Sequence, residues 1–312
     1  MMERMAARGL EMLDDEVLTK FMRRHRMRYT AGLSPAMART IGAETGSWAV
    51  LITSLDLYDQ HQPPKVGLTS RLVTTEDPPR IVWMNSTARV GDQAPGGFEW
   101  GLIPELDVVQ GRVLSELTAS LAGERSVSSR KARRRFRPAA HYASPDFPIV
   151  RDSTARVAVL PFVNDSTRRY AGEILTDQLI GQLVEVGANV VEPGLVRQVM
   201  LESRQFYSEG PSVPETDLLR LHLSADVVVF GEVSRYDEKL GPQAAQVEFL
   251  VRAIDTETGQ LIWASSSFAG GNKGVYFFGA GRVHAAQSLA TEMARALVDT
   301  VLRERAKAAK KQ

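Results

Sequence analysis

Residues 156–163 read Arg-Val-Ala-Val-Leu-Pro-Phe-Val, and this stretch indicates the class of the fold. The uninterrupted β-branched and apolar run is typical of a buried strand. Pro161 and the turn-forming residues 164–166 close it. We expect Asp165 or Ser166 to cap the following helix. In that helix apolar residues recur at helical spacing: Ile174, Leu175, Leu179, Ile180 and Leu183.

The residues downstream predict the rest of one domain. Gly187 is expected to end the first helix. The further predictions are a strand at 189–191, helices from Pro193 to about 204 and from Pro214 to about 223, a strand at 226–233, hairpin strands at 246–254 and 260–267, and a helix from about 283 to 305. The order of these elements predicts an α/β domain with a mixed sheet. It runs strand, helix, strand, two helices, three strands and helix.

The first part of the chain repeats this pattern 178 positions earlier. Aligned pairs include Gly9–Asp14 with Gly187–Glu192, Met22 with Met200, Tyr58-Asp59 with Tyr236-Asp237, and, after small gaps, Trp83 with Trp263 and Gly111-Arg112 with Gly281-Arg282. Because aromatic positions and their order are kept over about a hundred residues, we predict a duplication.

The first copy starts late. Met1–Arg8 align with Leu179–Val186, so equivalents of the first strand and of most of the first helix (156–178) are absent. We expect the natural reading frame to begin upstream of Met1; the alternative is a genuine but degenerate first repeat. The expected organisation is an incomplete first repeat at 1–122, a basic linker at 123–153, a complete repeat at 154–305 and a basic tail at 306–312.

Composition excludes several classes of protein. The 312 residues include 38 basic and 37 acidic residues, and the formal net charge of +1 gives no overall attraction to nucleic acid or membrane. Without cysteine, the chain has no disulfide, thiolate metal site or cysteine nucleophile. No apolar run approaches the roughly 20 residues that a membrane span needs.

Three stretches of the second copy resemble the TolB amino-terminal and CsgG-like domains. They are Val157–Phe162 with the later Ala171-Gly172-Glu173, the run Leu223–Val233, and the hairpin Ile254–Trp263. The resemblance, which covers most of 156–305 and more faintly 9–122, implies tandem three-layer α/β domains whose first strand lies between the second and third. The first domain would lack its first strand and most of its first helix.

The same resemblance implies a function and a location. CsgG-like domains occur in bacterial envelope proteins, including LpoB-type activators, and imply a non-enzymatic scaffold or interaction protein that binds other envelope proteins. They also imply a lipoprotein exported to the periplasm or to the inner face of the outer membrane. The chain departs from this pattern, because Met1–Asp15 has no apolar signal core and no cysteine is present to carry lipid.

A basic run in the linker is one candidate contact site. Between Glu124 and Pro138 seven basic residues face one acidic residue, and the candidates are Arg130, Lys131, Arg133, Arg134, Arg135 and Arg137. They could contact anionic lipid, with about 1 kcal/mol gained per basic residue near an anionic surface, or form a solvated spacer. Specific nucleic-acid binding is not expected, because Phe136 is the only interleaved aromatic residue.

The loop after each aligned tryptophan is the second candidate. Partner-binding residues would be Phe98 and Trp100 in the first copy, and Tyr276, Phe277, Phe278 and Arg282 in the second. The aromatic side chains could instead pack as core under the last helix. An alternative function is a small-ligand or nucleotide-binding module that uses the loop Gly270–Arg282, although its glycines fit neither common phosphate-binding pattern.

The sequence predicts no enzyme, cofactor or metal site. The five histidines, His25, His61, His141, His222 and His284, are scattered, without ligand spacing to one another or to a carboxylate pair. We expect His222 on a helix and His284 at the surface or in a cap. Neither the oligomeric state nor a specific partner follows from these patterns.

Overall fold

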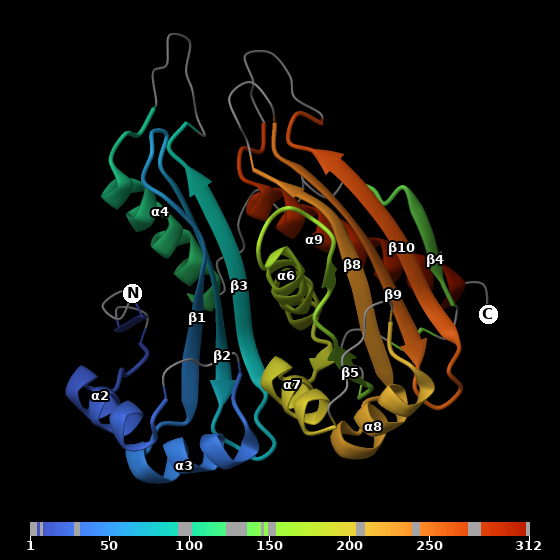
Figure 1. The fold of residues 1–312 in the computed structure, drawn as a ribbon, viewed down its shortest axis with the longest axis horizontal. Coiled ribbons are helices and arrows are strands. Elements are labelled where there is room, and N and C mark those ends of the chain that lie inside the picture. The colour runs from blue at the N-terminus through green and yellow to red at the C-terminus, as the bar shows by residue number, and fades with distance from the viewer. Residues whose placement is uncertain are drawn as a thin grey trace.

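The computed structural model describes residues 5–6, 9–27, 32–92, 102–122, 136–144, 147–148, 154–203, 210–238, 244–273 and 282–309. They form a mixed α/β fold with two sheets (Figure 1). None of the helices in these ranges has the length and apolar character that would let it cross a membrane.

The larger sheet is built from the second part of the chain. Its strands are β4 (Ala140–Ala143), β5 (Arg156–Val159), β6 (Val163–Asn164), β7 (Asn189–Val190), β8 (Val227–Asp237), β9 (Gln246–Asp255) and β10 (Leu261–Gly270). Their order is β4-β10-β9-β8-β5-β7, with β6 beside β8. The first predicted strand, β5, lies between β7 and β8 and runs parallel to both, as expected. The remaining pairs along this order are antiparallel.

Helices cover both faces of this sheet. On one face α6 (Ala171–Glu185) and α9 (Ala286–Ala309) bury apolar residues of β5, β8, β9 and β10. On the other face α7 (Pro193–Glu202) and α8 (Val213–Leu223) pack against Ala158, Leu160 and Val228. Ser212 and Glu215 form a reciprocal capping box that begins α8. The second part of the chain is therefore three layers deep.

Three local predictions for this part of the chain were wrong or incomplete. Neither Asp165 nor Ser166 caps α6, which begins at Ala171 after Tyr170 in a left-handed conformation (φ 60°). The stretch 156–163 is divided into β5 and β6, because Pro161 cannot donate a backbone hydrogen bond to a sheet. Residues 140–143, placed in the linker, form β4 on the edge of β10.

The smaller sheet comes from the first part of the chain. Its strands β1 (Ala49–Asp59), β2 (Lys65–Thr74) and β3 (Ile81–Val90) are antiparallel and lie in the order β1-β2-β3. The helix α4 (Leu106–Ala119), followed by the short η2 (Ser120–Ala122), packs on one face. The helices α2 (Asp15–Arg24) and α3 (Pro35–Thr45) pack at one end of the other face.

The two sheets share one layer of helices. Both α6 and α9 contact β3 as well as the larger sheet, so they lie between the two sheets (Figure 1). This position explains why α6 is buried on nearly all sides, including the polar residues Thr176, Gln178 and Gln182. The smaller sheet therefore covers the side of α6 and α9 that faces away from the larger sheet.

The helix and strand bounds follow the sequence alignment closely. The helices α2 and α7, the helices α3 and α8, and the strands β1 and β8 have bounds exactly 178 positions apart at both ends. The sequence-based duplication and its domain limits remain predictions, but this offset gives a direct comparison between equivalent positions of the two sheets.

Candidate interaction site

Most of the sequence-predicted site residues lie outside the described residues. These are Phe98, Trp100, Tyr276, Phe277, Phe278, Arg130, Lys131, Arg133, Arg134 and Arg135. Arg137 is described and exposed, whereas Arg282 is half-buried beside the start of α9. Phe136 is buried in the core of the second part, so it does not serve as an exposed aromatic of the basic run. The predicted contacts of both loops and of the linker stay predictions.

The histidines contact single carboxylates rather than one another. The hydrogen-bonded pairs are His25–Glu44, His61–Asp59 and His284–Asp92, and His141 forms an ion pair with Glu304. His222 is exposed on α8, as predicted. His284 is buried, which corrects the expected surface position. Within the described ranges no group of histidine, aspartate and glutamate has the geometry to hold a metal ion.

The strand β1 carries an exposed apolar face that the sequence analysis did not predict. Leu55 and Tyr58 are 59% and 49% exposed. Their equivalents on β8, at the offset of 178, are Val233 and Tyr236, which are 0% and 2% exposed. Val233 and Tyr236 pack in the same cluster as α6. Leu55 and Tyr58 are therefore exposed on β1 where the residues at the same offset on β8 are buried.

A second group of exposed apolar residues lies on α2. Val17, Leu18 and Met22 are exposed. Their equivalents on α7, at the same offset, are Leu195, Val196 and Met200. Those three are buried in a cluster that includes Ala158 and Leu160, from β5 and the residue after it. The residues of α2 are therefore exposed where the equivalent helix meets a strand.

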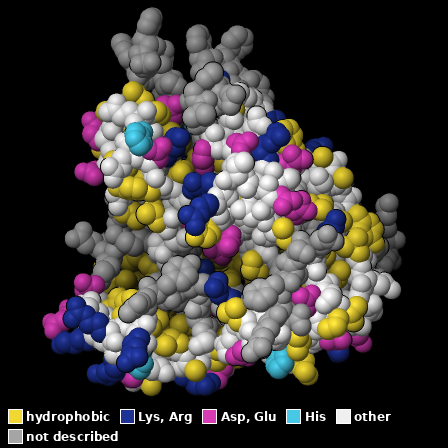
Figure 2. Space-filling view, viewed as in Figure 1, with side chains coloured by type: hydrophobic (Ala, Val, Ile, Leu, Met, Phe, Trp, Pro, Cys, Tyr) yellow, Lys and Arg dark blue, Asp and Glu magenta, His cyan; other side chains and the backbone are white. Residues whose placement is uncertain are grey.

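The outer edge of β1 completes this surface. In the described part of the chain β1 pairs with β2 alone, while β8 pairs with β9 on one side and with β5 and β6 on the other. We call the outer edge of β1 at 49–55, together with Leu55, Tyr58, Val17, Leu18 and Met22, the open-edge surface. Hydrophobic side chains gather below α4 on this flank of the molecule (Figure 2).

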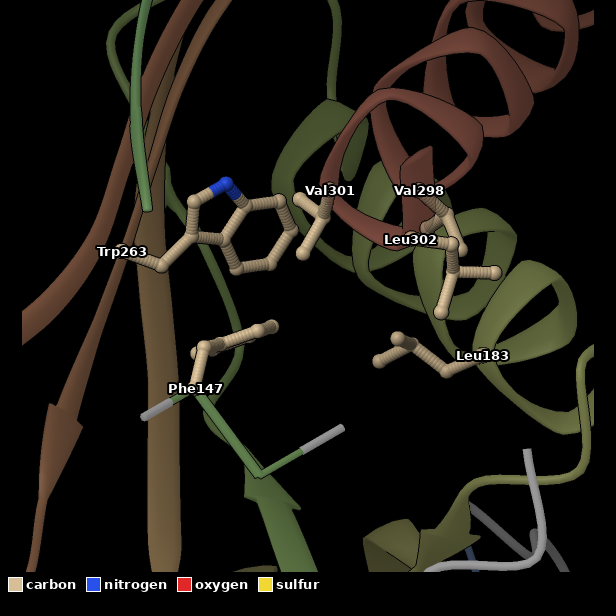
Figure 3. Close-up of a pocket in the computed structure, with 6 residues that line it drawn as sticks. All are labelled: Phe147, Leu183, Trp263, Val298, Val301 and Leu302. Carbon is tan, nitrogen blue, oxygen red and sulfur yellow. The ribbon is translucent and has the colours of Figure 1, made fainter. Parts of the chain in front are cut away.

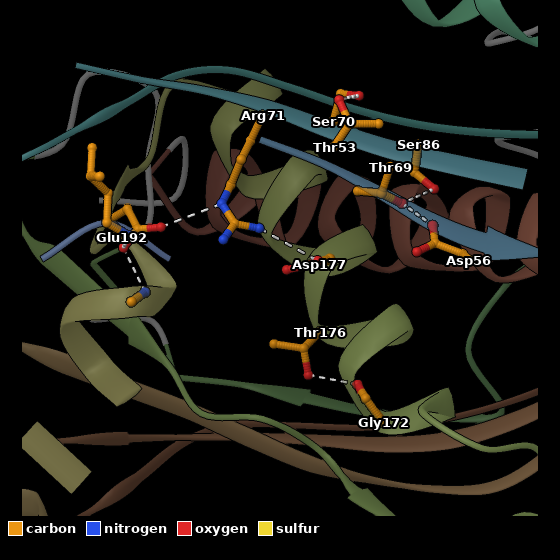
Figure 4. Close-up of polar contacts among 12 residues, drawn as sticks. Thr53, Asp56, Thr69, Ser70, Arg71, Ser86, Gly172, Thr176, Asp177 and Glu192 are labelled. Atoms are coloured by element: carbon orange, nitrogen blue, oxygen red, sulfur yellow. Dashed lines mark hydrogen bonds and ion pairs between the residues drawn. The ribbon is translucent and has the colours of Figure 1, made fainter. Parts of the chain in front are cut away.

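A buried ion-pair cluster joins the smaller sheet to the helices of the second part. Arg71 of β2 lies 3.6 Å from Asp177 of α6 and 3.3 Å from Glu192, the residue before α7 (Figure 4). Glu192 is 0% exposed and accepts backbone hydrogen bonds from Gly194 at 2.5 Å and from Leu33 at 3.2 Å. The Glu192 carboxylate thus caps α7 in the second part of the chain, accepts a hydrogen bond from the Leu33 backbone in the first part, and pairs with Arg71.

A hydrogen-bond cluster lies further along the same junction. The carboxylate of Asp56 accepts from the Thr69 hydroxyl at 2.5 Å and from the Gln287 side chain at 2.8 Å, and Gln287 also donates to Ser86. Arg168 donates to the Asp56 backbone carbonyl at 2.7 Å. These contacts connect β1, β2 and β3 to the loop before α6 and to α9 (Figure 4 shows the Asp56–Thr69–Ser86 part). The arrangement holds the two halves of the chain together through hydrogen bonds of Asp56, Gln287 and Arg168.

Burial controls the ionisation of the carboxyl groups in this junction. Burial raises the pKa of Asp177 to about 6, against the lowering effect of Arg71 and with further raising by Asp56, Glu192 and Glu173. Burial also raises the pKa of Asp56 and of Glu192, opposed mainly by Thr69 and by Arg71 respectively. The folded protein therefore binds these protons more tightly than the unfolded chain does.

The raised pKa of Asp177 predicts a pH dependence of stability. Its pKa of about 6 in the folded protein lies above the ordinary aspartate value of 3.8, so the folded state holds more protons between these pH values. The contribution of Asp177 to stability is present below about pH 4 and is lost as the pH rises to about 6. Replacing Asp177 by asparagine is expected to raise the free energy of unfolding at pH 7.5 by about 1–3 kcal/mol and to flatten its decline between pH 4 and 6.5.

Urea titrations at several pH values measure this effect. Asp217→Asn is the matched control, because Asp217 lies on the exposed face of α8 in an i,i+3 pair with Arg220. The control should leave the pH profile unchanged. An Asp177→Asn profile parallel to that of the unsubstituted protein would contradict the raised pKa.

A small apolar hollow lies in the core of the second part (Figure 3). Phe147 and Trp263 face Leu183 of α6 and three residues of α9, and the lining consists of Phe147, Leu183, Trp263, Val298, Val301 and Leu302. It offers no charged group to a ligand. The described residues of the loop Gly270–Arg282 do not line it, and the ligand-binding role of that loop stays a prediction.

Comparisons with known proteins give partial overlaps. No family model matches the sequence, and no curated protein matches it. The similar structures include the PelC dodecamer from Paraburkholderia phytofirmans, at 16% identity over 52% of this chain and 95% of that chain, with a TM-score of 0.37. Lipoprotein GNA1162 from Neisseria meningitidis is 18% identical over 37% of this chain and 80% of that chain, with a TM-score of 0.32.

The LpoB C-terminal domain from Escherichia coli is also similar. It is 12% identical over 37% of this chain and 82% of that chain, with a TM-score of 0.29. The LpoB-type resemblance noted in the sequence thus has a counterpart among the structural neighbours, whereas the CsgG and tandem-domain interpretations stay predictions.

Proposed function

We propose that this chain is a non-enzymatic interaction protein of the bacterial cell envelope that binds other envelope proteins. The observation that carries the interaction role is the open-edge surface, because its apolar residues are exposed where their equivalents in the second part are buried. Exposed apolar side chains beside a strand edge are typical of a site that binds an extended polypeptide. The envelope location is supported by the sequence resemblance described first.

The internal chemistry also favours binding over catalysis. Three groups with raised pKa values, Asp56, Asp177 and Glu192, lie in contacts that join the two halves of the chain. Two others also have structural contacts, since Tyr236 packs in the core and Glu238 accepts a hydrogen bond from the backbone N–H of Ala286 at the start of α9. The predicted contacts of the aromatic loops and of the basic linker with partners or anionic lipid remain part of the proposal. A periplasmic site, or one on the inner face of the outer membrane, is the proposed location.

Photo-crosslinking in a bacterial host tests this function. A photoreactive amino acid at position 55 of this chain is expected to form a covalent adduct with a protein of the envelope fraction. Leu221, exposed on α8, is the matched control position and should give no such adduct. Recovery of the chain in the cytoplasmic fraction, or equal crosslinking from both positions, would reject the proposal.

A further inference from the structure

We propose that the outer face of the larger sheet docks on the α4 side of a second copy of this chain, so that chains associate head to tail. The inference does not use the open-edge surface and goes beyond the proposed function. It is drawn from the way in which the two halves of one chain pack on each other.

Helices and sheets alternate through the molecule. The helix α4 packs on one face of the smaller sheet, and α6 and α9 lie between that sheet and the larger one (Figure 1). Successive residues of β3 face these two layers, since Asn85 donates to the Leu117 carbonyl of α4 and the Ala88 carbonyl accepts from Ser288 of α9. A second copy placed with its α4 against the larger sheet would continue this order, as a head-to-tail contact does.

The outer face of the larger sheet lies on the side away from α6 and α9. Arg252 of β9 is paired in register with Phe230, which packs with α7 and α8, and with Ala264 of β10, which is paired with Tyr142 of β4. Side chains of paired residues lie on the same side of a sheet. Beyond α7 and α8 this side carries exposed and half-buried residues. We call them the outer sheet face: Tyr142, Glu248, Leu250, Arg252, Ala264, Ser266 and Phe268.

The equivalent face of the smaller sheet is the one that packs on α6 and α9. The bounds of β9 and β10 lie 181 and 180 positions after those of β2 and β3 at both ends. The register is also the same, because Arg71 lies opposite Met84 and Arg252 lies opposite Ala264. Met84 is buried in the same cluster as α6. The smaller sheet therefore shows what kind of surface covers this face.

Opposite charges match at one position of the proposed contact. Arg252 is equivalent to Arg71, which lies 3.3 Å from Glu192, the residue that caps α7. At the offset of 178 Glu192 is equivalent to Asp14, which is exposed and caps α2 by accepting from the Glu16 N–H at 2.8 Å. Repeating the internal packing between two chains brings Arg252 of one copy to Asp14 of the next. Complementary charges of this kind favour one docking orientation over others.

Apolar side chains match at a second position. Within one chain Ser288 of α9 contacts Ala88 of β3 at 3.0 Å. The helices α4 and α9 begin 180 positions apart, so Val108 holds the place of Ser288, and Phe268 holds that of Ala88. Val108 and Phe268 are both exposed. Their contact would remove apolar surface from water, at about 25 cal/mol for each Å².

The contact between copies is expected to be looser than the junction within one chain. Gly67 approaches the Gln287 side chain so closely that no side chain would fit there. The equivalent residues, Glu248 and Asp107, are larger and carry like charges. They require a wider spacing, which Phe268 in place of an alanine also requires. We therefore expect reversible association in the micromolar range rather than a permanent complex.

Sedimentation equilibrium of the purified full chain tests the proposal. The weight-average mass is expected to rise with concentration beyond that of a dimer, because each docked copy leaves one outer sheet face free. Phe268→Asp should weaken the association at least about tenfold, because it places a charge in an apolar contact. Leu221→Asp, at an exposed site on α8, should leave it unchanged.

Two sedimentation results would overturn the proposal. One is a single monomeric species at about 300 µM, where a micromolar complex would be mostly formed. The other is a mass that stops rising at a dimer, since this would indicate a two-fold contact between identical surfaces.

A charge exchange identifies the two docking faces. Arg252→Glu places a second carboxylate at Asp14, and Asp14→Arg places a second guanidinium group at Arg252, so each variant alone is expected to lose association. An equimolar mixture of the two variants restores opposite charges at every contact and is expected to associate. A mixture that stays monomeric would contradict the pairing. Arg220→Glu, at an exposed site on α8, is the matched control, and melting curves establish that each variant is folded.

Photo-crosslinking from position 268 identifies what covers the outer sheet face. In the purified protein the expected adduct joins two chains, and the peptide from the second chain maps to residues 105–116. A crosslink within one chain would assign the face to another segment of the same chain, and an adduct formed only with a different protein in the host would replace the second copy. Either result would overturn the proposal. The proposed function is tested separately, by the adducts from position 55.

Discussion

Replacing Arg71 by methionine is expected to lower the free energy of unfolding by about 3–5 kcal/mol at pH 7.5, because the buried carboxylate of Glu192 and the half-buried carboxylate of Asp177 lose their cation. Arg71 lies within 3.6 Å of Asp177 and 3.3 Å of Glu192, and Glu192 is fully buried. Methionine keeps much of the side-chain volume, so the loss reports on charge rather than on a cavity. Urea denaturation followed by circular dichroism measures it.

Arg80→Met is the matched control for this substitution. Arg80 forms an exposed i,i+4 ion pair with Glu76, and such pairs contribute about 0–1 kcal/mol. The double variant Arg71→Met/Glu192→Gln should recover part of the lost stability, since it removes a charge that Arg71 no longer balances. Equal losses for Arg71→Met and Arg80→Met would show that the buried cluster is energetically equivalent to a surface pair.

Replacing Trp263 by alanine is expected to cost about 3–5 kcal/mol through the loss of buried surface and the cavity left behind. Its ring is buried, lies 5.5 Å from that of Phe147 between centroids, and borders the existing apolar hollow. The cavity would therefore adjoin the small apolar hollow. Thermal and urea unfolding measure the effect.

Two further variants test whether the cost comes from burial of the Trp263 ring. They are Trp48→Ala and Trp263→Phe. Trp48 is exposed, so its truncation should change the stability by no more than about 0.5 kcal/mol. Trp263→Phe retains an aromatic ring and should cost less than Trp263→Ala. A similar cost for truncation at positions 48 and 263 would be incompatible with a core role for Trp263.

The sequence predicted the helices and strands of the second part well because their patterns are local. Pro193 and the Ser212–Glu215 capping box mark two helix starts, and the turn at 255–259 marks the hairpin. The strand β4 was missed because its four residues gain their strand conformation from pairing with β10 rather than from an apolar pattern. The start of α6 was misplaced because Tyr170 adopts a left-handed conformation that its side chain does not advertise.

The candidate site was less predictable than the fold. The alignment predicted that Met1–Arg8 correspond to the end of the first helix of the second part, but it did not single out Leu55 or Tyr58 as exposed residues. It could not indicate that Leu55 stays exposed while Leu57, two positions later, is buried, because the bulge between them changes which face each side chain occupies. The pairing of Arg71 with Asp177 and Glu192 joins residues more than a hundred positions apart and has no local signal.

The helical layer shared by the two sheets constrains how this chain can evolve. A recombination event that deleted residues 1–122 would expose the side of α6 that carries Asp177, and with it buried polar groups suited to a sheet rather than to water. Deletion of the second part would in turn remove α6 and α9 from the face of β3 that they cover. Each half therefore supplies part of the buried surface of the other. Loss of either half would require compensating substitutions along α6.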